Sequence, residues 1–140
     1  MGKRIKVYTA SCLNKGPLWR ELASVWEEVE IVARWPFLHV NNEGLPDWPE
    51  DCPAHGAEFW QQDHDDVLRA DVVLIYAIET DELRGALVES GMALGLGKPV
   101  IVAGKNHRFG TWQYHRLARR VPTLEAARSL LRLMSTPASV

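Results

Sequence analysis

Asp71-Val-Val-Leu-Ile-Tyr-Ala-Ile78 is the stretch that decides the fold of this chain. Its apolar residues follow one another without the alternation typical of a strand with one wet face, so we expect a strand buried on both faces. Residues 85–96, rich in small and apolar side chains, predict a helix that Gly97 and Pro99 end. A second apolar strand, Pro99-Val-Ile-Val-Ala103, follows. A strand, a helix and another strand in this order predict a parallel β-α-β unit.

The same alternation extends toward both ends of the chain. The remaining elements that the periodicity predicts are strands over residues 5–10 and 30–35 and helices over residues 18–29, 58–70 and 123–134. We therefore predict a single α/β domain over residues 1–140. Its core is expected to be a doubly wound, flavodoxin- or Rossmann-like parallel sheet of four to five strands with helices on both faces.

Two long loops interrupt this pattern. Residues 37–57 contain three prolines and two glycines, and a structureless loop of this length inside a domain is usually a lid or a binding loop. A second loop is expected over residues 104–114. Both are candidates for covering a ligand.

Composition excludes several classes of protein. The chain has 46% apolar and 24% charged residues and a net charge of -2, so nothing in its overall charge favours nucleic acid or an acidic membrane surface. Cys12 and Cys52 are too few for a disulfide framework. The first residues lack the apolar core of a signal peptide, and no apolar run reaches the ~18 residues that span a bilayer. We expect a cytoplasmic protein with no membrane partner.

Two carboxylates flank the decisive strand. Asp63 precedes it and Glu89 follows it, in the helix expected over residues 85–96. The loops at the carboxyl ends of parallel strands form the ligand crevice, and two carboxylates that converge there are what cleavage of a glycosidic bond requires. Tyr8, on the first strand, could donate a hydrogen bond to Glu89 and orient it. The helix N-terminus is expected to lower the pKa of Glu89.

Each of these residues also has a plainer interpretation. Glu89 could be a solvated helix position, and Asp63 could belong to a solvated acidic face formed by Asp63-His64-Asp65-Asp66. Tyr8 could be an ordinary strand residue. Six tryptophans are present; Trp19 and Trp26, seven apart, predict one buried helix face, whereas others could line a pocket for a flat ring.

Several motifs together carry a resemblance to a known family. They are Tyr8, Asp63 placed 26 residues (89 - 63) before Glu89, the strand Ala70-Asp-Val-Val-Leu74, the segment from Gly85 through Glu89-Ser-Gly91 to Gly95, and Lys98-Pro-Val-Ile-Val102. On these motifs the chain resembles the nucleoside 2-deoxyribosyltransferase-like proteins, including the related nucleotide N-glycosidases. The resemblance covers most of the length.

The resemblance implies roles for the residues. Glu89 falls on the family's nucleophile, Asp63 on the acid near the leaving base, and Tyr8 on the tyrosine that orients the nucleophile. The candidates for binding the substrate, a nucleoside or nucleotide, are Ser11, Arg84, Gly85 and Trp60. Arg84 and the helix N-terminus after it could hold a 5′-phosphate. The family often builds its site across a subunit interface, which implies a homodimer or a higher homo-oligomer.

We expect no cofactor and no metal. Cys52 and His55 lie close together in the proline-rich loop, and His64 follows, but no further ligands have the spacing of a metal site. The favoured interpretation is an enzyme, which could be either a hydrolase or a transferase.

Two other functions remain as alternatives. Ser11, Leu83 and Ser90 stand where the family usually has a glycine, an acidic residue and a leucine, which would suit a non-catalytic nucleotide-binding or sensor module. Residues 105–120 interleave basic and aromatic side chains, as single-strand nucleic-acid binders do. For this segment a lid or plain surface is preferred, because the rest of the chain is acidic, and no nucleic-acid partner is expected.

Overall fold

The structure is a computed structural model that describes residues 3–37 and 53–135, with side chains from residue 56 onward in the second part. It contains one five-stranded sheet in which every neighbouring pair is parallel, in the order β2-β1-β3-β4-β5. The strands are β1 (Ile5–Ala10), β2 (Val29–Ile31), β3 (Val72–Ala77), β4 (Val100–Gly104) and β5 (Ala118–Val121). This strand order confirms the prediction of a doubly wound α/β fold.

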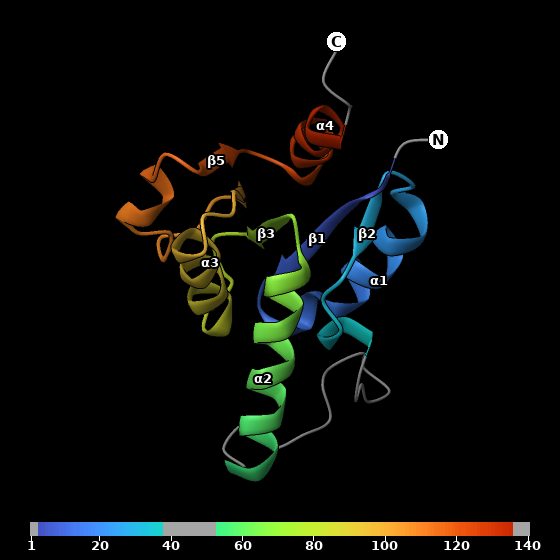
Figure 1. Cartoon of the computed structure of the whole chain (residues 1–140). Coiled ribbons are helices and arrows are strands. Elements are labelled where there is room, and N and C mark those ends of the chain that lie inside the picture. The colour runs from blue at the N-terminus through green and yellow to red at the C-terminus, as the bar shows by residue number, and fades with distance from the viewer. Residues whose placement is uncertain (1–2, 38–52, 136–140) are drawn as a thin grey trace.

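The helices cover both faces of the sheet. They are α1 (Gly16–Val25), α2 (Pro53–Arg69), α3 (Gly85–Gly95) and α4 (Leu124–Ser135). The chain leaves β1 toward β2 through α1 and returns past β1 to β3 through α2, and right-handed connections therefore place these helices on opposite faces. The α3 helix packs beside α2, and α4 joins the α1 side, where Arg128 pairs with Glu28 at 2.7 Å (Figure 1).

The core is centred on β3. Its residues Val72–Ile75 are completely inaccessible to solvent, as expected for an uninterrupted apolar strand with helices on both sides. Trp19 and Trp26 are also buried, but only Trp19 lies on α1: the helix ends at Val25, short of its predicted bounds of 18–29, and Trp26 packs from the connection to β2. Within the described part of the chain, no helix is long and apolar enough to cross a lipid bilayer.

The second strand differs from its predicted bounds of 30–35. It ends at Ile31, and Trp35–Phe37 forms a short 3-10 helix instead. The Trp35 indole nitrogen donates a hydrogen bond to the Thr9 carbonyl at 2.8 Å, which holds the chain against the end of β1. Pro36, which lacks an N–H, cannot extend a sheet ladder there.

Strand β5 has no counterpart among the predicted elements. Arg119 and Arg120 are exposed on it, so its sequence lacks the alternation of apolar and polar residues that predicts a strand. Among the described strands it pairs with β4 alone, at one edge of the sheet. Main-chain hydrogen bonds, and not an apolar face, therefore specify this strand. Of the predicted loop over residues 37–57, residues 38–52 lie outside the described residues, and 53–57 belong to α2.

One ion-pair cluster anchors α2. The Asp66 carboxylate is fully buried and accepts hydrogen bonds from the Arg34 backbone nitrogen at 3.0 Å and from Nε of the same residue at 2.9 Å. Arg69 adds an ion pair at 2.8 Å. The cluster links α2 to the segment after β2. It thereby fixes the position of Asp63, one helical turn earlier, relative to the sheet.

Gly104 ends β4 in a conformation that only glycine adopts without strain. Its φ is +91°, and a β-carbon there would lie 2.1 Å from the Ala77 carbonyl oxygen. We predict that Gly104→Ala lowers the free energy of unfolding by about 3 kcal/mol or more, because both the left-handed backbone and the clash oppose it.

Gly97→Ala is the matched control. Gly97 also has a positive φ, +76°, but no atom lies within 4 Å of a β-carbon there. Its cost should be about 1 kcal/mol, from the backbone alone. Urea unfolding of both variants measures the difference, and equal losses would contradict the steric argument.

Candidate active site

The candidate site is organised around Tyr8. It is the fourth residue of β1 and is fully buried. Tyr8 is in register with Val73 and lies on the α2/α3 face, opposite to Thr9 and Leu74, because successive strand residues alternate. From that face the carboxylates of Glu89 and Asp63 both act on the Tyr8 hydroxyl and, after burial itself, raise its pKa. The fold thus brings together the three residues that the sequence proposed as catalytic.

The Tyr8 hydroxyl is not fully satisfied. Among the described residues it has no hydrogen bond that meets strict limits of distance and angle, yet it lies close enough to Glu89 and Asp63 for hydrogen bonding to lower the pKa of both. The three groups are therefore assembled but not closed into a formed hydrogen-bond network. Buried polar groups in this state are rare in folded proteins; Thr9 Oγ1, on the opposite face of β1, is another here, so the feature supports a site only together with the two carboxylates.

Glu89 projects from α3 toward the start of that helix. It belongs to the buried side of α3 and is 7% exposed, so the interpretation as a solvated helix position is wrong. A β-carbon at Gly85, one turn earlier, would lie 3.3 Å from Oε1 of Glu89. The carboxylate therefore lies against the first turn, as expected for side chains that tilt toward the helix N-terminus.

The predicted lowering of the pKa of Glu89 is wrong. Burial raises this pKa well above its ordinary value, the Asp63 carboxylate raises it further, and the Tyr8 hydroxyl opposes the change. The partial charge of a helix N-terminus contributes at most about 2 kcal/mol, which loses to the removal of a carboxylate from water.

Asp63 is the second carboxylate of the pair. Burial and the nearby Asp66 raise its pKa from 3.8 to about 6, and Tyr8 and Arg34 partly oppose this. Asp63 is partly buried, Asp65 is exposed and Asp66 is fully buried, so the acidic run is not one solvated face. Glu89 and Asp63 repel each other and together retain a proton at higher pH than isolated carboxyl groups would. A pair of this kind can act as base and acid near neutral pH.

Not all of the predicted binding residues lie near this pair of carboxylates. Gly85 is beside Glu89, and Trp60 lies one turn before Asp63 on α2, with 44% of its surface exposed. Arg84 immediately precedes α3 and is exposed, and as the N-cap residue it makes no side-chain capping hydrogen bond to that helix. Ser11 follows β1, but its hydroxyl accepts a hydrogen bond from the Trp19 indole at 2.8 Å, so it braces α1 on the other face.

The departures from the family pattern have structural roles. Ser90 is buried in α3 and donates to the Ala86 carbonyl at 2.8 Å, and Leu83 is 3% exposed in the core. Sequence analysis assigned no role to Asp81 or Asn106, yet both are buried polar residues, and the Asn106 amide donates hydrogen bonds to the carbonyls of Ile78 and Asp81. Asp81 follows the end of β3, and an aspartate just after a strand typically accepts a hydrogen bond from the backbone of its own turn.

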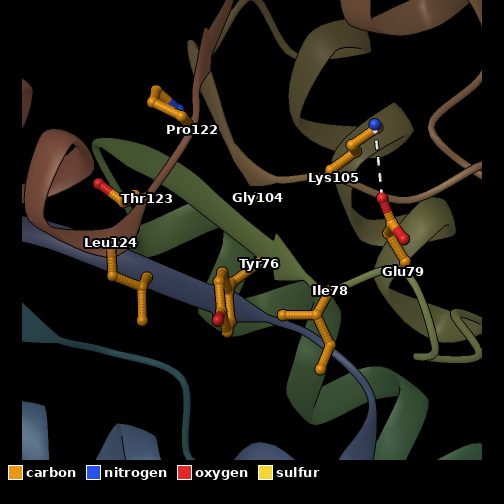
Figure 2. Close-up of a pocket in the computed structure, with 8 residues that line it drawn as sticks. All are labelled: Tyr76, Ile78, Glu79, Gly104, Lys105, Pro122, Thr123 and Leu124. Carbon is orange, nitrogen blue, oxygen red and sulfur yellow. Dashed lines mark ion pairs between the residues drawn. The ribbon is translucent and has the colours of Figure 1, made fainter.

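A hollow near the same edge of the sheet is a separate feature. Figure 2 shows it between the ends of β3 and β4 and the start of α4, with Tyr76, Gly104 and Thr123 on its walls. Its volume is about 290 Å³. Tyr76 packs edge-on against Trp19 of α1, so the hollow opens on the α1/α4 face, opposite to Tyr8. It is too open to enclose a small ligand and contains none of the predicted site residues.

Metal ligands are not grouped in the described part of the chain. Over those residues, no set of three or more histidine, cysteine, aspartate and glutamate side chains could hold a metal ion. Cys52 lies outside the described residues, as does the side chain of His55, and His64 lies beside Asp65 on the surface of α2.

The raised pKa of Asp63 predicts a pH-dependent stability. Between pH 3.8 and about 6 the folded protein keeps a proton that the unfolded chain has lost, so the free energy of unfolding falls as pH rises through this window. Relative to Asp63→Asn, the wild type should lose about 2 kcal/mol between pH 4 and pH 7. Urea unfolding of both proteins at a series of pH values measures this.

Asp65→Asn is the control on the same helix. Asp65 is exposed and its pKa is lowered, chiefly by a hydrogen bond from Gln61, so its contribution to stability has the opposite sign: it is lost as pH falls. A difference between wild type and Asp63→Asn that stays constant over pH 4–7 would contradict the raised pKa.

Comparison with known proteins supports the fold assignment and gives no information about the chemistry. No family model matches the chain, and no curated protein matches it. A crystal structure described as a conserved protein from Enterococcus faecalis V583 is similar, with a TM-score of 0.67 and 12% sequence identity over 94% of this chain and 99% of that chain. At this identity the likeness shows the fold alone. The chain thus shares a doubly wound α/β fold, over nearly its whole length, with that protein.

Proposed function

We propose that this protein cleaves, or transfers a sugar at, the N-glycosidic bond of a nucleoside or a nucleoside 5′-monophosphate. The observation that carries the proposal is the convergence of Tyr8, Asp63 and Glu89 at one buried point on the α2/α3 face of the sheet. Two carboxylates with shifted pKa values and an unsatisfied hydroxyl provide a nucleophile, a proton donor and an orienting group.

Glu89 serves as the nucleophile in this mechanism. One of its oxygens bonds to the anomeric carbon as the bond to the base breaks through an oxocarbenium-like transition state. The electron pair of the broken bond leaves with the base, and Asp63 supplies the proton that the base takes up. Water then attacks the glycosyl ester and releases the sugar, or a second base accepts it.

The high pKa of Glu89 is compatible with this role. Burial and Asp63 favour the neutral form only while no cation is nearby. Positive charge that develops on the sugar favours the Glu89 carboxylate, so the proton that the pair shares passes from Glu89 to Asp63, which then donates it to the departing base. Tyr8 lies next to both carboxylates and can hydrogen-bond whichever one is ionised.

The surroundings of the pair suit a nucleotide. Gly85 leaves the carboxylate of Glu89 open to close approach, since any side chain there would crowd it. The N-terminus of α3, which follows the cationic Arg84, suits a 5′-phosphate. Trp60 offers an exposed ring, one turn from Asp63, on which a base can stack.

Base release is the direct test. Purified protein is incubated with ribo- and deoxyribonucleosides and their 5′-monophosphates, and free base is followed by chromatography. We predict release that falls at least about 1,000-fold in Glu89→Ala, because the nucleophile is lost. Glu82→Ala, which removes an exposed glutamate seven residues earlier, should retain wild-type turnover within about twofold.

Other outcomes separate the alternatives. Near-normal release in Glu89→Ala would remove Glu89 from the mechanism. No release from any substrate, with thermal stabilisation by a nucleotide, would instead identify a non-catalytic binding or sensor module. The homo-oligomer and the cytoplasmic location implied above also remain proposals, and sedimentation velocity measures the former.

Gly85→Ala tests the space around Glu89. A β-carbon 3.3 Å from Oε1 displaces the carboxylate, so we predict roughly a tenfold fall in turnover or more, without loss of thermal stability. Gly91→Ala is the matched control in the same helix, because no atom lies within 4 Å of a β-carbon there. It should stabilise α3 slightly and leave turnover unchanged. Equal turnover in the two variants would contradict the assigned position of Glu89.

A further inference from the structure

A buried carboxylate organises the connection between β3 and α3. Asp81 is 7% exposed, and its Oδ2 accepts a hydrogen bond from the Ile78 backbone nitrogen at 2.9 Å. The Asp81 backbone nitrogen donates to the Ile78 carbonyl at 3.1 Å. The chain between these two residues is therefore a turn closed by both the main chain and the side chain of Asp81.

A second connection is tied to this turn by charge. Lys15, between β1 and α1, places Nζ 3.4 Å from Oδ1 of Asp81, and its side chain is only 18% exposed. The same ammonium group lies 5.9 Å from the centre of the Tyr76 ring. Cys12 is near as well: burial and then Asp81 raise the pKa of its thiol to about 11. Both carboxylate oxygens of Asp81 thus have specific partners.

A third connection joins through Asn106, which follows β4. Asn106 is 6% exposed, and its amide nitrogen donates to the carbonyls of Ile78 and Asp81, each at 2.8 Å. Its side-chain oxygen accepts from the Arg108 backbone nitrogen at 2.9 Å. The connections after β1, β3 and β4 are consequently held as one unit, which we call the Asp81 clamp (Lys15, Ile78, Asp81 and Asn106).

The clamp lies directly upstream of Glu89. Only three residues, 82–84, separate Asp81 from Gly85, where α3 begins, and the middle one, Leu83, is anchored in the core. Gly85 in turn is the residue against which Oε1 of Glu89 rests. A shift of the turn at Asp81 would move the first turn of α3 and displace the carboxylate from Tyr8 and Asp63.

We propose that Asp81 is a positioning residue, which, through Lys15 and Asn106, fixes the start of α3 and so places Glu89 against Tyr8 and Asp63. This inference rests on the proposed function of Glu89. It also explains why a charged group is buried here: the Ile78 N–H and the Lys15 ammonium both require an acceptor, which an apolar residue could not supply. The effect of Asp81 on Glu89 is indirect, because it acts through the position of the first turn of α3.

The experiment compares Asp81→Ala and Asp81→Asn with Glu28→Ala. Glu28 is a matched control, because it is a partly buried carboxylate that pairs with Arg128 at the α1/α4 side of the molecule. We expect kcat to fall roughly 10–100-fold in Asp81→Ala with KM changed less than about threefold, since misplacement affects the reaction more than binding. Asp81→Asn keeps an acceptor for Ile78 and loses the charge, so it should lie between wild type and Asp81→Ala.

A second readout does not depend on turnover. The carboxyl carbon of Glu89, followed by NMR as pH is varied, should change its titration midpoint by at least about half a pH unit in Asp81→Ala and not in Glu28→Ala. If Asp81→Ala does not fold, Asn106→Ala removes the clamp from its other side and carries the same expectations.

The outcomes separate the two proposals. A wild-type protein that releases no base refutes the proposed function, and the titration of Glu89 then decides alone whether Asp81 positions it. Turnover and a Glu89 titration in Asp81→Ala that both match those of Glu28→Ala would overturn the positioning role, whatever the substrate.

Discussion

The burial of β3 on both faces is the constraint on which the rest of the structure depends. A strand with no wet side requires a helix layer on each face, and right-handed connections then allow few arrangements of the neighbouring strands. The order β2-β1-β3-β4-β5 places α2 and α3 side by side over β1 and β3. As a result, Tyr8, Asp63 and Glu89 meet although they come from three different elements.

Polar burial follows two distinct patterns in this protein. Asp66 and Asp81 are buried with full compensation, the first by Arg34 and Arg69 and the second by Lys15 and the turn at Ile78. These carboxylates fix the positions of α2 and α3. Glu89, in contrast, is buried and Asp63 partly buried beside it, and both pKa values rise, although Arg34 partly opposes the rise at Asp63. Burial that raises the pKa of a carboxyl group costs stability at neutral pH, and groups with strongly shifted pKa values cluster at functional sites.

Sequence reasoning worked best where periodicity and burial coincide. The first strand matches its predicted bounds, and β3, α3 and α4 lie within one or two residues of theirs. It failed where main-chain bonding alone specifies an element, as in β5, and where a buried side chain redirects the chain, as Trp35 does after β2. The pKa of Glu89 was predicted in the wrong direction, because the desolvation that dominates it depends on packing between α3, α2 and β1.

The sequence by itself determined the parallel α/β architecture, since an uninterrupted apolar strand followed by a small-residue helix permits little else. It also identified Tyr8, Asp63 and Glu89 as candidates through their spacing and a family resemblance. Only the tertiary structure decided that these three side chains share one buried point, that Ser11 bonds to α1 instead, and that Asp81 ties three connections together. The physical reason is that burial, and contacts between residues distant in sequence, arise only when the strands pair and the helices pack on them.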